Sequence, residues 1–163
     1  MEKDIVWGGS GIEHIVFEHI KNTIPDEATI IELGGGDCST RAFSSIANLY
    51  TVEHDNRFLN HDDLTTYIYA PIKDGWYDRK KLAGKLPNKY DLVFIDGPSG
   101  AGLWLRSGIL NNLGLFKEET TFVLHDTWRE QDCCLASDLA QTLNKKIVYY
   151  EEGNPIDYWA VVK

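Results

Sequence analysis

Residues 30–40 read Ile-Ile-Glu-Leu-Gly-Gly-Gly-Asp-Cys-Ser-Thr and predict a strand, a tight turn and a helix in succession. The apolar, β-branched run before the glycines predicts a buried strand, and the polar residues after them predict the first turn of a helix. Glycines at such a turn let a ligand approach the backbone closely, and the free amides of the helix favour negative charge. A polar, partly anionic small molecule is therefore the expected ligand.

The spacing of the glycines separates the known classes of nucleotide site. A dinucleotide fingerprint has a third glycine where this chain has Ser39, and a phosphate-binding P-loop has a lysine that is absent here. The remaining pattern, Glu32-x-Gly34-x-Gly36-x-x-Ser39-Thr40, resembles motif I of the class I S-adenosylmethionine (SAM) dependent methyltransferases. In that family the glycines lie under the methionine part of the cofactor, and the acidic residue lies close to its amino group. The resemblance implies that these five residues bind SAM.

Both glycines of this pattern, Gly34 and Gly36, are expected to need positive φ and space beside the ligand. A second acidic residue, Glu53, lies near the end of the next predicted strand, residues 50–55, and 21 residues after Glu32. In nucleotide-binding α/β folds, an acidic group about 20 residues beyond the glycine turn accepts hydrogen bonds from the ribose hydroxyls. Glu53 is therefore expected to bind the ribose.

A third strand is predicted over residues 66–71. It ends at Pro71, because a proline cannot continue a central ladder. Pro71 and Ile72 then fall where such folds meet the adenine ring of the cofactor. The aromatic pair Trp76-Tyr77 follows, and the sequence favours equally a pocket lining and surface packing for it.

Two further strands end in residues that carry chemistry. Residues 90–95 predict a strand that ends at Asp96, and residues 120–124 predict one that ends at His125 and Asp126. Ligands of open α/β sheets bind outside the carboxyl ends of the strands, so these three side chains are expected at the active edge, and Asp96 is also expected to contact the cofactor.

Three roles are open for them. His125 or Asp126 is a candidate base for a hydroxyl of the methyl acceptor, and a basic His125 is expected to titrate near pH 6.5. Alternatively, Asp96 and Asp126 hold a divalent cation such as Mg²⁺. In the third role the two aspartates only cap turns and pair with Arg129. This role is favoured over metal binding. This chain has His125-Asp126 where metal-dependent, catechol-type relatives carry an Asp-Asn pair. The sequence therefore does not establish that a metal binds here.

Alternating strands and helices predict an α/β fold with a doubly wound, mostly parallel sheet and helices on both faces. Residues 146–150 and 157–162 predict a C-terminal antiparallel hairpin, which is typical of seven-stranded methyltransferases. Helices are expected over residues 40–49, 79–86 and 103–113, and from Arg129 to Leu143. The resemblance spans roughly residues 7–163 and points to a group of small methyltransferases that methylate sugars or other hydroxyl-bearing small molecules.

The N-terminal part, residues 1–27, predicts one amphipathic helix and a candidate lid. Apolar residues from Ile12 to Ile24 recur at spacings of three and four, and Ser10 with Glu13 is expected to form a capping box at the helix start. The preceding Trp7-Gly8-Gly9 either frays or folds over the ligand.

Length and composition limit the classes of protein. The 163 residues suit one domain, and the net charge of -9 argues against a nucleic-acid or acidic-membrane partner. Three cysteines without metal-ligand spacing indicate reduced thiols and a cytoplasmic location. A homo-oligomer is compatible with these data.

The predicted function is SAM-dependent methylation, on oxygen of a small molecule or sugar. The alternative is a non-catalytic module that keeps the SAM-binding fold. A nicotinamide enzyme is disfavoured by Ser39 at the position of the third glycine.

Overall fold

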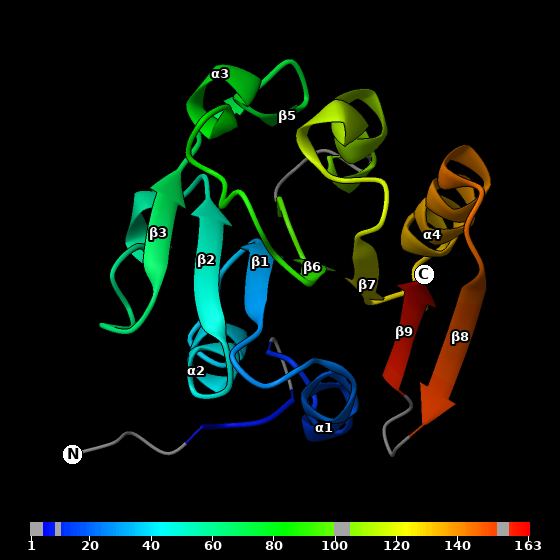
Figure 1. The fold of residues 1–163 in the computed structure, drawn as a ribbon, viewed down its shortest axis with the longest axis horizontal. Helices are drawn as coiled ribbons and strands as arrows, with labels where there is room; N and C mark the ends of the chain where they lie inside the picture. The colour runs from blue at the N-terminus through cyan, green and yellow to red at the C-terminus, as the bar shows by residue number, and fades with distance from the viewer. Residues whose placement is uncertain (1–4, 9–10, 100–104, 153–156) are drawn as a thin grey trace.

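The computed structural model describes residues 5–8, 11–99, 105–152 and 157–163. Within these ranges the chain forms a seven-stranded sheet in the order β3-β2-β1-β6-β7-β9-β8 and a separate two-stranded hairpin, β4-β5 (Figure 1). Strands β3, β2, β1, β6 and β7 are parallel, and β9 pairs antiparallel with both β7 and β8. The predicted fold, with its C-terminal antiparallel hairpin, is confirmed.

The strands of the sheet are β1 (Thr29–Leu33), β2 (Asn48–Glu53), β3 (Thr66–Tyr69), β6 (Leu92–Ile95), β7 (Thr121–His125), β8 (Ile147–Glu152) and β9 (Asp157–Val162). The hairpin consists of β4 (Ile72–Lys73) and β5 (Trp76–Tyr77). The α-helices are α1 (His14–Thr23), α2 (Ser39–Ser44), α3 (Arg79–Leu82) and α4 (Glu130–Leu143), and the 3-10 helices are η1 (Asn56–Phe58) and η2 (Arg106–Leu115).

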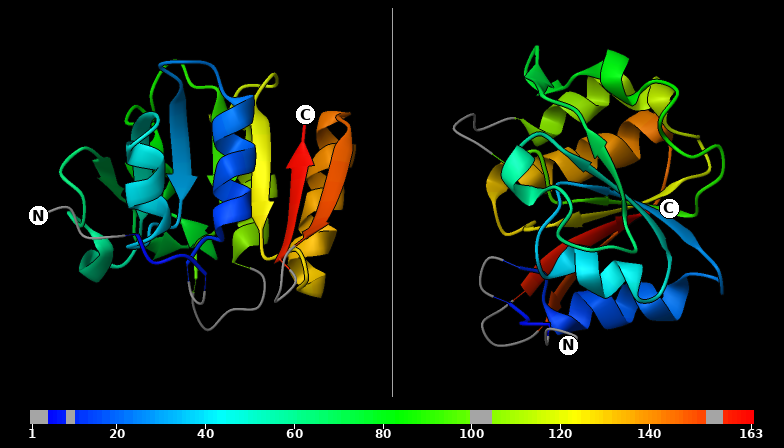
Figure 2. Two further views of the ribbon diagram at one scale, coloured as in Figure 1. Left: turned by 90° about the horizontal axis from the view of Figure 1, so that it is seen from below. Right: turned by 90° about the vertical axis from the view of Figure 1, so that its left-hand side faces the viewer.

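Helices cover both faces of the sheet, as the right-hand view in Figure 2 shows, and an apolar cluster fills the space on each face. On one face, α1 and α2 pack on residues such as Ile30, Phe94 and Trp159. On the other face, α4, η2 and the β4-β5 hairpin pack on residues such as Leu33 and Leu124. Because consecutive residues of a buried strand point to opposite faces, continuous apolar strands fill both clusters.

Several elements differ from the sequence-based predictions. The helix predicted over residues 40–49 is α2, which already ends at Ser44 because β2 begins at Asn48. The helix predicted over residues 79–86 is only the single turn α3. The segment predicted as a helix over residues 103–113 is the 3-10 helix η2, and residues 103–104 lie outside the described ranges. Trp76 and Tyr77 are 2% and 1% exposed, so surface packing is wrong for them and they belong to the core.

The N-terminal helix begins at His14, later than the apolar pattern indicates, and Glu13 is its N-cap residue without a side-chain cap hydrogen bond. The predicted capping box is therefore wrong for Glu13, while Ser10 lies outside the described residues. Trp7 packs on Phe17 of α1, with ring centroids 5.1 Å apart, and the predicted lid falls partly on residues 9–10, which are not described.

All three cysteines are free thiols. Among the described residues, no helix combines the length and the apolar character needed to cross a membrane.

Candidate functional site

The turn after β1 approaches the turn after β6 so closely that only glycine fits. Gly34 has a φ of +89°, and a Cβ placed on it would lie 2.6 Å from Cα and N of Gly97. The prediction for Gly34 is confirmed, because L-residues disfavour this φ and the neighbouring backbone cannot yield easily.

Gly36 differs from Gly34, because its φ is not positive and a Cβ there would meet only the Ser39 hydroxyl, at 3.7 Å. The prediction that Gly36 needs positive φ is wrong. Gly35, which the motif leaves as a variable position, has the tighter environment: a Cβ on it would lie 2.6 Å from Cγ2 of Thr51. Spacing alone could not identify Gly35, since the crowding atom comes from β2.

Glu32 lies fully buried below this turn. Its Oε2 accepts hydrogen bonds from the hydroxyls of Thr40, at 2.7 Å, and Thr51, at 2.6 Å. Burial raises the pKa of Glu32 to about 7, against the opposing effect of the hydroxyls of Ser39, Thr51 and Thr40. Its other oxygen, Oε1, is buried and accepts no hydrogen bond of good geometry from the described residues.

Ser39 and Thr40 open helix α2, and both are buried. The Thr40 hydroxyl also accepts a hydrogen bond from the backbone N–H of Gly36, at 3.1 Å. Thr40 thus joins the glycine turn to Glu32, and all the motif residues of β1 and α2 come together as the resemblance implies.

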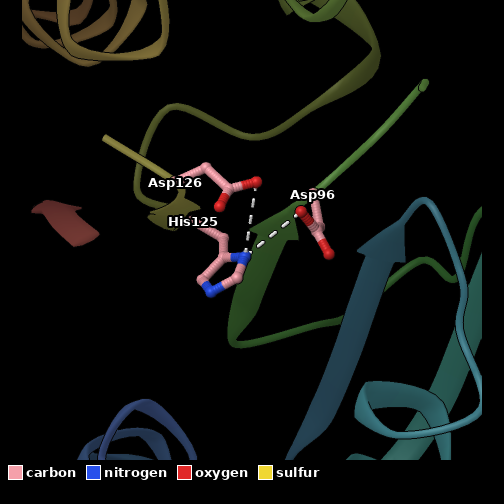
Figure 3. Close-up of side chains that lie close together, drawn as sticks. All are labelled: Asp96, His125 and Asp126. Carbon is pink, nitrogen blue, oxygen red and sulfur yellow. Dashed lines mark hydrogen bonds and ion pairs between the residues drawn. The ribbon is translucent and has the colours of Figure 1, made fainter. Parts of the chain in front are cut away.

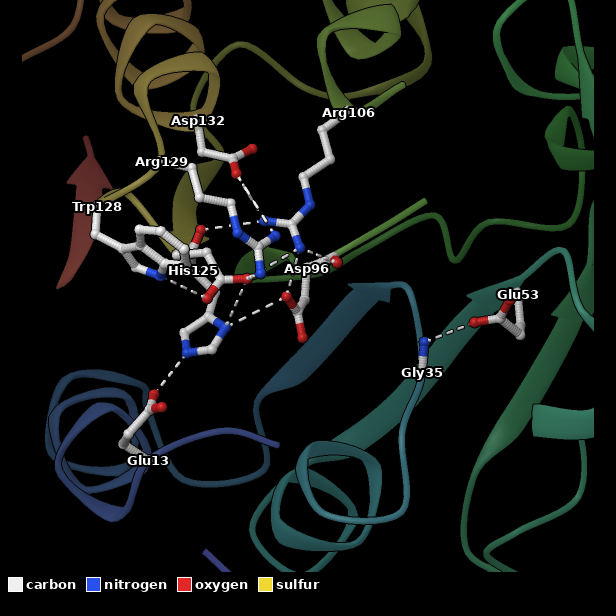
Figure 4. Close-up of polar contacts among 10 residues, drawn as sticks. Glu13, Gly35, Glu53, Asp96, Arg106, His125, Trp128, Arg129 and Asp132 are labelled. Atoms are coloured by element: carbon white, nitrogen blue, oxygen red, sulfur yellow. Dashed lines mark hydrogen bonds and ion pairs between the residues drawn. The ribbon is translucent and has the colours of Figure 1, made fainter. Parts of the chain in front are cut away.

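Glu53 ends β2 beside the same turn, as Figure 4 shows. Its Oε2 accepts a hydrogen bond from the N–H of Gly35 at 3.0 Å, and its Oε1 accepts from the N–H groups of His54 and Asp55 at 2.6 and 2.9 Å. These bonds fix the carboxylate next to the glycine turn, where the sequence places it.

Pro71 and Ile72 follow β3, the strand next to β2. The N–H of Ala70 donates to the carbonyl oxygen of Glu53 at 2.9 Å, so this segment starts alongside the end of β2. Pro71 is half-buried and Ile72 is 37% exposed, which leaves the predicted adenine contact open to a ligand.

The three residues predicted at the ends of β6 and β7 also meet, as Figure 3 shows. Asp96, His125 and Asp126 each offer a ligand atom, and these atoms lie within 4.8 Å of one another. His125 Nδ1 lies 3.3 Å from Oδ1 of Asp96 and 3.7 Å from Oδ2 of Asp126.

Two arginines occupy this cluster, and Figure 4 shows both. Nη2 of Arg106 lies 2.8 Å from Oδ1 of Asp96 and 3.3 Å from Oδ2 of Asp126, and its Nη1 lies 3.3 Å from Oδ2 of Asp132. Arg129 pairs with Oδ2 of Asp126 at 3.0 Å. The predicted pairing of Asp126 with Arg129 is confirmed, but the chief partner of Asp96 is Arg106, which sequence reasoning missed.

The donor set does not suit a metal ion. A divalent cation needs carboxylate oxygens that are free to coordinate it, whereas Oδ1 of Asp96 and Oδ2 of Asp126 already bind a guanidinium that is only 11% exposed. A second positive centre beside Arg106 would meet repulsion at close range. Asp96, His125 and Asp126 therefore do not form a metal site in this arrangement.

His125 is held between two carboxylates. Its Nε2 lies 2.6 Å from Oε2 of Glu13, the residue just before α1, and its Nδ1 lies 3.3 Å from Oδ1 of Asp96. Burial by itself lowers the pKa, but the hydrogen bonds to Asp96 and Glu13 outweigh it and raise the pKa of His125 to about 10. The imidazole is therefore protonated at neutral pH, and the prediction of a base that titrates near pH 6.5 is wrong.

One carboxylate oxygen of the cluster remains available. Oδ1 of Asp96 binds Arg106 and His125, whereas its Oδ2 accepts no hydrogen bond from the described residues. Both oxygens of Asp126 are engaged, because Oδ1 accepts from the indole N–H of Trp128 at 3.2 Å. Asp96 is thus the group that can accept a proton from a ligand.

The fold of this chain resembles solved structures, whereas its sequence does not match known families. No protein-family model matches this chain, and no curated protein matches its sequence. A precorrin-6y methyltransferase from Geobacter metallireducens has a similar structure, with a TM-score of 0.69 and 16% identity over 98% of this chain and 93% of that one.

Two further solved structures are similar. The N-terminal domain of human METTL16 in complex with SAH gives a TM-score of 0.57 and 16% identity over 91% of this chain, and 65% of that chain is covered. A protein described as an rRNA methylase from Clostridium thermocellum gives a TM-score of 0.58 and 11% identity, over 91% of this chain and 93% of that one. The chain therefore has the Rossmann-like fold of the SAM-dependent methyltransferases.

Proposed function

We propose that this protein is a SAM-dependent methyltransferase that methylates an oxygen of a small molecule or sugar. One observation carries the proposal. The glycine turn has no room for side chains at Gly34 and Gly35, and it lies beside the fixed carboxylate of Glu53 at the carboxyl edge of the sheet. Cofactors of open α/β folds bind at this edge.

The residues of the site suit the parts of SAM. Glu32 offers a buried carboxylate oxygen, Oε1, to a positively charged amino group, and Glu53 offers acceptors to ribose hydroxyls. Pro71 and Ile72 offer apolar surface to the adenine. When bound, SAM supplies a methyl group on a positively charged sulfur, and the sulfur keeps the electron pair of the broken C–S bond.

Asp96 is the proposed proton acceptor. As the new O–CH₃ bond forms, the hydroxyl of the methyl acceptor gives its proton to Oδ2 of Asp96, so that the oxygen of the methylated product carries no positive charge. His125 and Arg106 hold Oδ1 of the same carboxylate at 3.3 and 2.8 Å, and Asp126 fixes Arg106 in turn. Positioning of the acceptor supplies most of the remaining rate enhancement.

A small molecule is favoured over RNA as the methyl acceptor. The net charge is -9, and the described ends of β6 and β7 use their arginines for internal pairs. Neutralising several phosphates requires free basic side chains. We therefore propose no nucleic-acid or membrane partner.

A non-catalytic SAM-binding module is the second candidate. It is favoured by the full occupation of His125 and Asp126, so that Oδ2 of Asp96 is the only side-chain oxygen of these three residues without a hydrogen bond from the described chain.

The two candidates separate in one pair of experiments. Calorimetry with SAM measures binding, and release of SAH in the presence of hydroxylated small molecules and sugars measures turnover. Asp96→Asn is expected to abolish turnover and to retain SAM binding, whereas Glu118→Gln, a change of an exposed carboxylate, serves as the control. Binding without turnover for any acceptor would favour the module, and absence of binding would refute both.

A further inference from the structure

A second feature of the carboxyl edge is a cavity of about 600 Å³ between the start of α4 and the end of the β8-β9 pair. Aromatic side chains, Trp128, Tyr149, Tyr150 and Tyr158, contribute to its lining, together with Glu130 and Glu151. Its volume lies in the range of sites for small molecules.

The cavity lies at the same edge of the sheet as the charged cluster. Strand β9 runs antiparallel to β7, so its first residues pair with the end of β7, and the N–H of Thr127 donates to the carbonyl oxygen of Tyr158 at 3.1 Å. Trp128 links the two sites directly, because it lines the cavity while its indole N–H binds Asp126. The cavity and the cluster thus share Trp128, whereas Asp96, His125 and Asp126 do not line the cavity.

The aromatic lining favours a ligand with a ring that can stack on it. Trp128 is 63% exposed and Tyr149 is 46% exposed, although both are large and partly apolar. Their polar atoms are used internally, since the Tyr149 hydroxyl donates to the carbonyl oxygen of Cys133. Exposed aromatic faces of this kind stack on aromatic or sugar rings.

The charges around the cavity select for a positive group. Glu130 and Glu151 are exposed, and none of the described lining residues is a lysine, arginine or histidine. The guanidinium carbon of Arg129 lies 5.2 Å from the centroid of the Trp128 ring, and this guanidinium is paired with Asp126. Carboxylates and aromatic faces both attract a cation and both disfavour an anion.

We propose that this cavity, defined by Trp128, Glu130, Tyr149, Glu151 and Tyr158, binds the methyl acceptor, and that the acceptor is a hydroxyl-bearing ring with a positively charged amine. The inference rests on the proposed function, because it names the class of its substrate. Aromatic amines and amino sugars share this chemistry.

Binding of small probes tests the cavity without SAM. Tyramine and glucosamine carry the proposed groups on an aromatic and a sugar ring, and 4-hydroxyphenylacetate and glucuronate are their negatively charged counterparts. The chain has five tryptophans, so its indole N–H signals can be followed by NMR, and Trp128→Phe identifies the signal of Trp128. We expect at least one cationic probe to shift that signal and to bind roughly tenfold more tightly than its anionic counterpart.

Two double variants sharpen the test. Glu130→Gln with Glu151→Gln should remove the preference for the cationic probe, whereas Glu118→Gln with Glu119→Gln removes two exposed charges before β7 and should leave it unchanged. The inference is overturned if neither cationic probe shifts the Trp128 signal, or if the anionic probes bind equally well. SAM affinity is measured separately and should stay unchanged in Trp128→Phe. If the cavity does not bind the acceptor, the probes fail while SAM still binds; if the proposed function is wrong, SAM itself does not bind.

Discussion

The carboxyl edge of the sheet has two regions in which the carboxylates have different partners. At the ends of β1 and β2, Glu32 and Glu53 accept hydrogen bonds from hydroxyl and backbone N–H groups. At the ends of β6 and β7, Asp96 and Asp126 pair with Arg106 and other cations. The first region leaves Oε1 of Glu32 without a hydrogen bond from the described residues, whereas the second pairs its carboxylates with the side chains of Arg106 and Arg129.

The largest effect is expected from Gly34→Ala in the first region. The new methyl group would meet backbone atoms of Gly97 at 2.6 Å and would oppose a φ of +89°. We expect a loss of about 4 kcal/mol or more in the free energy of unfolding, and loss of SAM binding. Urea denaturation and calorimetry measure the two quantities.

Gly84→Ala is the matched control. Gly84 also has positive φ, +78°, but no heavy atom lies within 4 Å of an added Cβ. It should cost only the backbone strain of about 1–2 kcal/mol. Equal losses at the two positions would mean that the contact between Gly34 and Gly97 contributes nothing.

In the second region, His125→Ala should destabilise the fold by about 3–5 kcal/mol at pH 6, because it leaves Glu13 and Asp96 without their shared partner. The pKa of His125 is raised from 6.5 to about 10 in the folded state, so its stabilisation is complete below pH 6.5 and is lost as the pH rises through 10. The difference in unfolding free energy between wild type and variant should shrink over this range.

His14→Ala provides the comparison, because His14 pairs with Glu18 on the exposed side of α1. An exposed pair contributes about 0–1 kcal/mol. A constant difference between wild type and His125→Ala from pH 6 to pH 10 would refute the ionic role of His125.

Much of this contrast could not be predicted from the sequence. Order along the chain placed Glu32, Glu53, Asp96 and His125 correctly at strand ends, because the carboxyl ends of parallel strands share one edge. The contact of His125 with Glu13 joins residues 112 positions apart, across two elements whose relative placement depends on packing. No local pattern encodes such a contact.

Arg106 was missed for a related reason. It comes from a segment that the apolar pattern assigned to a helix, and nothing in its neighbours indicates that its guanidinium reaches three aspartates. A lone basic residue within an apolar stretch is the one signal that could have identified it. The pKa of His125 was mispredicted because the sequence did not reveal its carboxylate partners.

A smaller effect is expected from Glu53→Ala, which should weaken SAM binding by about 1.5–3 kcal/mol. The change would remove the proposed acceptors for the ribose hydroxyls and also the hydrogen bond from the N–H of Gly35. Asp91→Ala is the control, because Asp91 likewise accepts from a backbone N–H, that of Thr29, but at the opposite end of the strands. Calorimetry should show weaker SAM binding only for Glu53→Ala, and unchanged affinity would exclude Glu53 from the site.

Metal removal is expected to have no effect on turnover. Arg106 occupies the space between Asp96 and Asp126, so EDTA should leave turnover unchanged and added Mg²⁺ should not raise it. Loss of activity with EDTA and its return with Mg²⁺ would show that the second region resembles the first, with carboxylates open to a ligand.

A crystal structure of the protein with SAH tests the difference between the two regions in a single measurement. We predict SAH over the turn at Gly34 and Gly35, with both ribose hydroxyls on the carboxylate of Glu53 and with the sulfur directed toward Asp96. The pairs of Arg106 should stay in place. SAH bound elsewhere, or bound at this edge without contact to Glu53, would contradict the account.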